Sequence, residues 1–339
     1  MIATHVLSPD VFRIDAVRET ERIVAGIRGT VLRQWKRRGA VIGVSGDIDS
    51  AVVAFLCARA LGKERVLALL TPETESSPDS LRLGRLVADA LGARTTVEDI
   101  TPVLKEAHCY ERRDEAVRRA VPEYGDGYQC RIVLPSAHEP QRRALFSVVI
   151  QAPGGRTNWV RLSAEAYLGI VAAANFKQRV RKMMEYYYAD LLQYAVAGTP
   201  NRLEYDQGFF VKNGDGAADV KPIAHLYASQ VRQLAAHLGV PDEILRQPPE
   251  AGAYPLEQSQ AEDYFMLPLE KMDFCLYGKN NGISAADLSA AVGLDTGQVQ
   301  LVYDAIQMKR KAAQYLHAPP VLVGEISGAV AVRARVRTR

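Results

Sequence analysis

The sequence has few cysteines and no apolar run long enough to cross a membrane. Its four cysteines, at positions 57, 109, 130 and 275, are widely scattered and form no CxxC pair. This usage is typical of reduced cytosolic thiols and argues against a disulfide framework or a zinc site. No stretch of 18 apolar residues occurs, so no membrane-spanning helix is expected. The first residues carry acids where a signal peptide needs an apolar core, which predicts a cytoplasmic protein without a membrane partner.

The sequence also lacks a strong excess of charge, internal repeats and low-complexity segments. Its 42 Lys plus Arg residues stand against 39 Asp plus Glu, a net charge of +3 that is too small to indicate nucleic acid as a partner. Hydrophobic residues make up 48% of the 339 and charged residues 24%, as in ordinary globular proteins. The length allows two domains or one large α/β domain.

The first hundred residues alternate between apolar β-rich runs and helical patterns. A helix is expected over residues 15–37, with Val24, Ile27, Val31 and Trp35 on one face. The strand pattern of residues 39–44 then leads into a helix that ends at Gly62. The same order repeats as a strand at 65–70, a helix over 77–92 and a strand at 94–100. Such alternation predicts a doubly wound parallel sheet with helices on both faces.

The regular alternation is interrupted after the next helical stretch, which is expected over residues 101–119. We interpret residues 121–160, with five prolines and glycines at 122, 125, 127, 135 and 140, as an insertion that includes a β-hairpin around Pro153-Gly154-Gly155. A long helix over 163–190, a strand within 191–198, a polar loop over 198–222, a helix over 226–239 and a helical C-terminal third follow. We therefore expect one large domain over 1–322 and a basic tail over 323–339.

The first strand runs directly into Ser45-Gly46-Asp47-Ile48-Asp49-Ser50 and a helix. Backbone N–H groups and the helix dipole favour a phosphate at such a turn, and ligands bind at the carboxyl ends of parallel strands. Asp49 would repel a bare phosphate, which implies a cation such as Mg²⁺ between them. The alternative is that Asp49 and Ser50 only cap the helix. No Gly-Lys-Ser/Thr follows, so this is not a kinase-type phosphate loop.

The strand–SGDIDS–helix pattern resembles the SGGxDS pyrophosphate loop of the N-type ATP pyrophosphatases, which have an adenine nucleotide alpha hydrolase-like fold. Within these, Gly198-Thr199-Pro200-Asn201-Arg202-Leu203-Glu204 and the following GFFVKNGDGAADVKPI are similar to the GTxNxxE…GxxxKxGDGxxDxxPI block of the ammonia-dependent NAD synthetase family. SSPDSL at 76–81 and NFKQRVRKM at 175–183 also fit. The resemblance covers about residues 15–322.

The resemblance implies an activity and a set of site residues. The family adenylates the carboxylate of deamido-NAD with ATP, and ammonia then displaces AMP to give NAD. Asp49 and Glu204 would be the catalytic pair and the ligands of Mg²⁺. Contacts to deamido-NAD are expected from Arg179, Lys212, Asp219 and Lys309. Contacts to ATP are expected from Gly43, Val44, Ser45, Gly46, Asp47, Ile48, Asp49, Ser50 and Thr199.

Several positions depart from the family pattern. Asp47 replaces the second glycine of the loop, where a carboxylate needs a partner such as Lys221 or Mg²⁺. Ala228 replaces an ATP-contacting Lys, Glu250 replaces a Ser or Thr, and Met308 replaces the His of a His-Lys pair. These departures leave three alternatives open: an NAD synthetase with a rearranged nucleotide site, an amide-forming relative with another carboxylate substrate, and an impaired paralogue that binds nucleotide without turnover.

Other partners also follow from the resemblance. No glutaminase domain is recognised, so free ammonia or a separate glutaminase would supply nitrogen. The family forms homodimers through long helices near the middle of the chain. Tyr186, Tyr187, Tyr188 and Tyr194 are candidates for that interface, with core packing as the alternative. Without the resemblance, the polar loop over 198–222 is still a candidate site because it follows a strand, with a solvated surface loop as the alternative. The alternative for Arg179 is the solvated face of a basic helix.

Overall fold

The computed structural model describes residues 7–133, 146–247, 264, 265 and 267–324. A four-stranded sheet in the order β3-β2-β1-β7 lies at its centre, and every neighbouring pair in it is parallel. The strands are β1 (Ala40–Gly43), β2 (Val66–Leu70), β3 (Arg94–Val97) and β7 (Ala195–Val196). The parallel sheet expected from the alternating pattern is confirmed.

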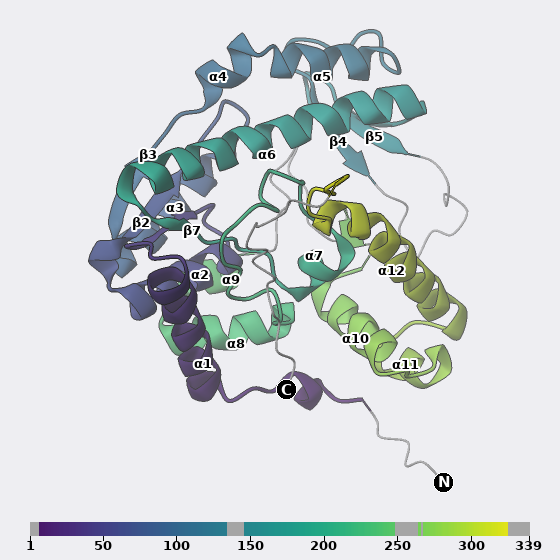
Figure 1. The fold of residues 1–339 in the computed structure, drawn as a ribbon. Coiled ribbons are helices and arrows are strands. Elements are labelled where there is room, and N and C mark those ends of the chain that lie inside the picture. Colours follow the sequence, from purple (N-terminus) through teal and green to yellow (C-terminus); the bar gives the residue numbers. More distant parts are fainter. Residues whose placement is uncertain (1–6, 134–145, 248–263, 266, 325–339) are drawn as a thin grey trace.

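Helices surround this sheet (Figure 1). A π-helical segment (Gly29–Gln34) continues α1, and short 3₁₀ turns lie at Pro9–Phe12 and Lys63–Arg65. The α-helices are α1 (Ala16–Arg28), α2 (Ile48–Leu61), α3 (Pro78–Leu91), α4 (Thr101–Glu106), α5 (Cys109–Arg118), α6 (Ala164–Leu192), α7 (Arg202–Gln207), α8 (Ala228–Leu238), α9 (Asp242–Arg246), α10 (Leu269–Asn280), α11 (Ala285–Val292) and α12 (Thr296–His317).

The two faces of the sheet carry separate hydrophobic clusters because side chains alternate along a strand. Ile42 of β1 packs in the cluster formed with α1, α2, α3 and α8. Its neighbour Val41 packs on the opposite face with Leu67, Leu69 and Ala189 of α6. All of these strand residues are buried, as expected for a parallel sheet that is covered on both sides.

Most predicted boundaries are confirmed, and two are wrong. Helix α3 begins at Pro78 and ends at Gly92, which has φ +61°. The predicted apolar face of the first helix includes Val31 but not Trp35, which is 41% exposed, because the helix widens to π spacing from Gly29 and ends at Gln34. The single helix expected over 101–119 is two helices, since His108 takes a left-handed conformation with φ +54°.

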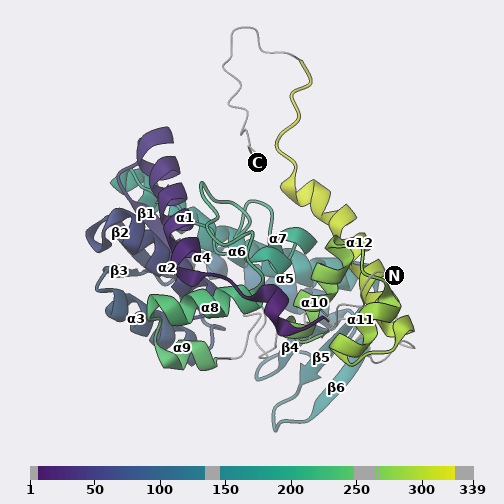
Figure 2. The same ribbon diagram turned by 90° about the horizontal axis from the view of Figure 1, so that it is seen from below.

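The predicted hairpin forms part of a second, antiparallel sheet with strands β4 (Gln129–Val133), β5 (Ser147–Gln151) and β6 (Thr157–Arg161). Its buried face, with Cys130, Val148 and Ile150, packs against α5 and the N-terminal part of α6. Figure 2 shows this sheet apart from the parallel one. Residues 134–145, the prolines at 248, 249 and 255, and the tail from 325 lie outside the described residues.

The C-terminal helices α10, α11 and α12 form a third cluster, which also contains Phe12, Leu203 of α7 and Tyr227. This cluster lies beside the polar segment that follows β7, so it supports that segment from outside the sheet. No helix in the described part of the chain is long and apolar enough to cross a membrane.

Gly46 joins the loop after β1 to helix α3. Its φ is +91°, and a Cβ at this position would lie 2.6 Å from the Cβ of Leu83 and 3.1 Å from the Ser80 carbonyl oxygen. Glycine therefore permits both the backbone conformation and the close contact with α3. The N-terminal half of α3 thus packs directly against the loop after β1.

We expect Gly46→Ala to lower the free energy of unfolding by about 2–4 kcal/mol, because strain at positive φ adds to a clash in a packed region. Gly154→Ala is the matched control, since Gly154 has φ +92° but no atom within 4 Å of an added Cβ. It should cost only about 1–2 kcal/mol. Urea denaturation of both variants measures the difference, and equal losses would show that contact with α3 does not matter.

Candidate functional site

The loop between β1 and α2 is held in shape by its own side chains. Asp47 is the N-cap of α2 and accepts hydrogen bonds from the Ser50 N–H at 2.7 Å and from the Ser45 hydroxyl at 2.7 Å. The backbone N–H of Val44 bonds to the Leu69 carbonyl oxygen, which ties the loop to β2. Asp47 therefore acts as a helix cap, as Ser, Thr, Asn and Asp commonly do.

This arrangement answers the question of a partner for Asp47. Lys221 does not pair with it: its ammonium lies 5.0 Å and 5.1 Å from the ring centroids of Tyr205 and Phe210. The partners of Asp47 come from the loop, so the missing second glycine is replaced by a residue that stabilises the turn.

Asn201 links the two halves of the site. Its side-chain N–H donates to Asp49 Oδ2 at 3.3 Å, and its backbone N–H donates to Glu204 Oε2 at 3.0 Å. The Glu204 N–H donates back to Asn201 Oδ1 at 3.2 Å, which completes a capping box at the start of α7. Asn201 is 1% exposed, so these bonds lie inside the protein. The structure thus brings Asp49 and Glu204 toward one another.

The two carboxyl groups that meet here both have raised pKa values. Burial and the charge of Asp47 raise the pKa of Asp49 to about 8. Burial and then Asp49 raise the pKa of Glu204 well above its ordinary value, and Asp47 and Asp215 add to the effect. The Asp49 Oδ1 atom is buried and has no hydrogen-bond partner in the part of the chain that the structure describes. A cation that binds oxygen atoms would relieve this charge and occupy that oxygen.

These residues fit Mg²⁺. Two carboxylates converge, one with an orphaned oxygen, and Mg²⁺ in nucleotide sites takes one or two carboxylates together with phosphate oxygens and water. Within the described residues, no cluster of three or more His, Cys, Asp or Glu side chains has the arrangement of a metal site. The protein would supply two ligands, and the remainder would come from the nucleotide and solvent.

The predicted substrate contacts lie on the segment after β7 and on α6. Arg179 donates from Nε to the Lys212 carbonyl oxygen at 3.2 Å, so these two residues are adjacent. Lys212 Nζ donates to the carbonyl oxygens of Tyr315 and Ala318, at the end of α12. Asp219 accepts the Val196 N–H at 2.8 Å and so fixes β7.

The other residues singled out by the sequence pattern lie in several different elements. Thr199 is half-buried in the turn between β7 and α7. Lys309 donates to the Tyr264 carbonyl oxygen and lies 4.1 Å from the Tyr264 ring centroid. Met308 is 66% exposed, and Glu250 lies outside the described residues. The Ala228 and Ser229 N–H groups donate to the buried Asp273, so the start of α8 is capped where the family pattern has a Lys.

Sequence reasoning assigned no role to three buried residues of this region. Asn201 could have been found from the N-x-x-E spacing of a capping box. The Lys182 ammonium donates to Glu185 Oε2 at 2.6 Å, and a Cβ on Gly43 would lie 2.8 Å from Glu185 Oε1. Glu185 thus packs on the end of β1, and nothing in the sequence of α6 distinguishes it from a surface glutamate.

The NAD synthase family model matches residues 19–121 and 160–314. The chain is 54% identical to the NH3-dependent NAD+ synthetase of Rhizobium meliloti (strain 1021), over 94% of this chain and 95% of that one. It is 36% identical to the enzyme of the same name from Thermotoga maritima, over 76% and 86% of the chains. Its fold is similar to the NH3-dependent NAD synthetase structure from Campylobacter jejuni, with a TM-score of 0.59, 22% identity and coverage of 91% and 100%.

The shifted pKa of Asp49 predicts a pH-dependent stability. A carboxyl group with a raised folded-state pKa stabilises the fold fully below its unfolded value of 3.8, and this contribution is lost as pH rises through about 8. Asp49→Asn removes this titration. The stability of the ligand-free variant, relative to the unmodified protein, should therefore increase as pH rises through this range. We expect a gain of about 1–3 kcal/mol above pH 8, measured by denaturation at several pH values.

Asp89→Asn is the control for that series, because Asp89 is exposed on α3. Its stability difference from the unmodified protein should not vary with pH. A gain for Asp49→Asn that is the same at all pH values would contradict the assignment of a charged, buried Asp49.

Proposed function

The chain belongs to the NAD synthase family, and we propose that the loop after β1 and the Asp49–Glu204 pair together carry its reaction. The activity is that of an NH3-dependent NAD+ synthetase, which converts deamido-NAD, ammonia and ATP to NAD, AMP and pyrophosphate. The observation that supports this site most directly is the convergence of two partly buried carboxylates on Asn201, beside a helix N-terminus. Among the described residues, Asp49 Oδ1 has no hydrogen-bond partner.

The chemistry explains why such a site is needed. A carboxylate is a poor electrophile, and ammonia does not displace oxide from it. Transfer of the adenylyl group from ATP converts that oxygen into a leaving group, and ammonia then attacks the acyl carbon. Mg²⁺ bound to Asp49 and Glu204 would offset the charge of the phosphates. The backbone N–H groups of the loop at the start of α2 would hold the pyrophosphate.

Asp47 supports catalysis in this proposal. Its carboxylate already accepts two hydrogen bonds from the loop, so it needs no further N–H donor from the groups that would bind the nucleotide. Its negative charge also favours a divalent cation next to Asp49. The alternative of an impaired paralogue rests on Asp47 and Ala228. The hydrogen bonds that Asp47 accepts within the loop favour a working enzyme, and a turnover assay tests the alternative.

For deamido-NAD, we propose the surface formed by Arg179, Lys212, Asp219 and Lys309. Lys212 now donates to two neutral carbonyl oxygens at the end of α12. A substrate phosphate would replace these neutral acceptors with a negative charge and so add an ion pair to the hydrogen bonds of the ammonium group. The second alternative is another carboxylate substrate, and comparing several carboxylates in the assay distinguishes the two.

The nitrogen source and location are also proposals. Ammonia is the donor named for the relatives, and a separate glutaminase would be a partner that supplies it. A cytoplasmic location is consistent with the four cysteines, which are all free thiols and buried.

The reaction is tested by incubating the protein with Mg-ATP, ammonia and a panel of carboxylates that includes deamido-NAD and nicotinate mononucleotide. AMP and NAD should form in equal amounts with deamido-NAD. Glu204→Gln keeps an oxygen for the capping bond but loses the charge, so kcat should fall about 10²–10³-fold. Glu21→Gln, an exposed glutamate on α1, should leave kcat unchanged. AMP formation with only another carboxylate would overturn the substrate assignment.

We also propose a homodimer that pairs through α6. This 29-residue helix carries Met183, Tyr187 and Leu191 at four-residue spacing, and these side chains are 61%, 57% and 63% exposed. Residues four apart lie on one helix face, so they form an apolar stripe. Tyr186, Tyr188 and Tyr194 are instead partly buried against the sheet. A second copy of α6 would cover the stripe, as apolar patches of this kind commonly need.

A glutamate pair, Tyr187→Glu with Leu191→Glu, should convert the dimer to monomer in sedimentation velocity by placing charge at the centre of the stripe. Met308→Glu is the control, because Met308 is equally exposed but lies on α12. A monomer in the unmodified protein, or a dimer that survives the pair, would refute this interface.

A further inference from the structure

Helix α6 extends past the carboxyl edge of the parallel sheet. Its C-terminal end lies at the start of β1, where the Arg38 N–H donates to the Gln193 carbonyl oxygen. Glu185, two turns earlier, contacts Gly43 at the end of β1. Residues before Glu185 therefore lie beyond the strand ends, on the side where the loop after β1 turns into α2. Arg181 is one helical turn before Glu185 and so lies on the same face of α6.

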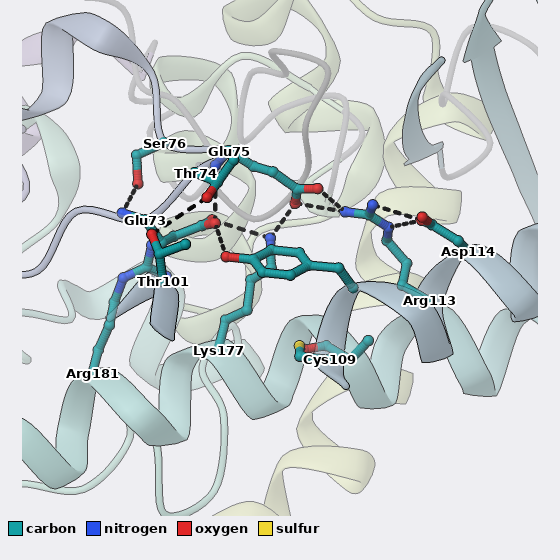
Figure 3. A network of polar contacts seen from close by, with 12 residues as sticks. Glu73, Thr74, Glu75, Ser76, Thr101, Cys109, Arg113, Asp114, Lys177 and Arg181 are labelled. Atoms are coloured by element: carbon teal, nitrogen blue, oxygen red, sulfur yellow. Dashed lines mark hydrogen bonds and ion pairs between the residues drawn. The ribbon is translucent and has the colours of Figure 1, made fainter. Parts of the chain in front are cut away.

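The loop between β2 and α3 faces this part of α6 through a buried ionic network (Figure 3). Glu73 Oε1 accepts the Lys177 ammonium at 3.1 Å. Glu73 Oε2 accepts the Tyr110 hydroxyl at 2.7 Å and the Glu75 N–H at 2.9 Å. Glu75 pairs with both Lys177 and Arg113. Both oxygens of Glu73 thus already have hydrogen-bond donors.

Arg181 is the cation of this network that lacks such a bond. Its Nη2 atom is 3.9 Å from Glu73 Oε1, beyond hydrogen-bond distance, and its side chain is 20% exposed. Among the described residues, no hydrogen bond donated by its guanidinium is found. Asp215, in the segment after β7, also acts on Arg181 electrostatically. Burial lowers the pKa of Arg181, but an arginine keeps its charge in a protein.

A guanidinium with unused donors, partly open to solvent, is arranged to bind an anion. It lies 3.9 Å from Glu73, in the loop after β2, and it is within electrostatic range of Asp215, in the segment after β7. Those two segments flank the loop after β1, where the pyrophosphate would bind. Because that loop would hold the β- and γ-phosphates, the α-phosphate is the next anionic group along the nucleotide.

We propose that Arg181 binds the α-phosphate of ATP and of the acyl-adenylate, which makes it a catalytic residue of the adenylation step. This rests on the proposed function above. The substrate carboxylate oxygen forms a bond to the α-phosphorus, and the bond from that phosphorus to the β-phosphate oxygen breaks, with its electron pair leaving on pyrophosphate. Arg181 stays protonated and donates to the non-bridging oxygens, where its planar fork matches two of them.

The adenylation step can be measured alone, as exchange of labelled pyrophosphate into ATP in the presence of deamido-NAD and without ammonia. Arg181→Ala should lower the exchange rate about 10²–10³-fold while the KM for ATP changes much less. Added guanidinium ion should restore part of the rate. Arg181→Lys keeps the charge and loses the fork, so it should retain the thermal stability of the unmodified protein and still exchange about tenfold more slowly.

Arg113→Ala is the matched control, because it removes a buried arginine from the same network at the Glu75 end. It should lower the melting temperature, because it leaves the partly buried Glu75 without one of its two cations, but leave exchange within about threefold, because Arg113 does not contact the proposed phosphate site. The inference is overturned if exchange is unchanged in Arg181→Ala and Arg181→Lys, or if Arg113→Ala slows exchange as much. Absence of exchange in the unmodified protein would instead overturn the proposed function.

Discussion

The structure depends on the burial of carboxylates at one edge of the sheet. Asp49 and Glu204 lie where two strands end. Burial raises both pKa values, and the charge of Asp47 adds to the shift of Asp49 as the charge of Asp49 adds to that of Glu204. Without a cation, such a site costs folding free energy. The chain limits that cost with a few donors, of which Asn201 is the most important because it contacts both residues. The negative charge that makes the ligand-free site unfavourable would also favour the binding of Mg²⁺ together with nucleotide.

Helix α6 connects the antiparallel sheet and the loop after β2 to that edge. Its last turns cover the sheet, its middle contacts β1 through Glu185, and its first turns support the antiparallel sheet. Lys177 on the same helix fixes the loop after β2 through Glu73 and Glu75. A long helix suits this role because it is rigid over a length that no loop could span with fixed geometry.

The sequence predicts those features that depend on local pattern. The strand, loop and helix around Asp49 and the limits of α3 follow from apolar runs, a proline and a glycine, and the insertion is marked by its broken rhythm. Contacts between distant segments were not predictable. Neither Glu185 nor Arg181 has a sequence feature that separates it from a surface charge on a helix, and only packing against β1 and Glu73 distinguishes them. The prediction for Trp35 was wrong because the first helix changes to π spacing over Gly29–Gln34, and the prediction of one helix over 101–119 was wrong because His108 takes a left-handed conformation.

The strand order has a consequence for how the chain folds. Strands β1, β2 and β3 are neighbours in sequence, but β7 joins β1 only after the whole of α6 and the antiparallel sheet. Asn201 and Asp49 are 152 positions apart, so their contact closes a long loop, and such contacts form late. During synthesis, the first half of the sheet would fold while Asp49 is still hydrated. The repulsive carboxylates would come together only when the rest of the core is present to hold them.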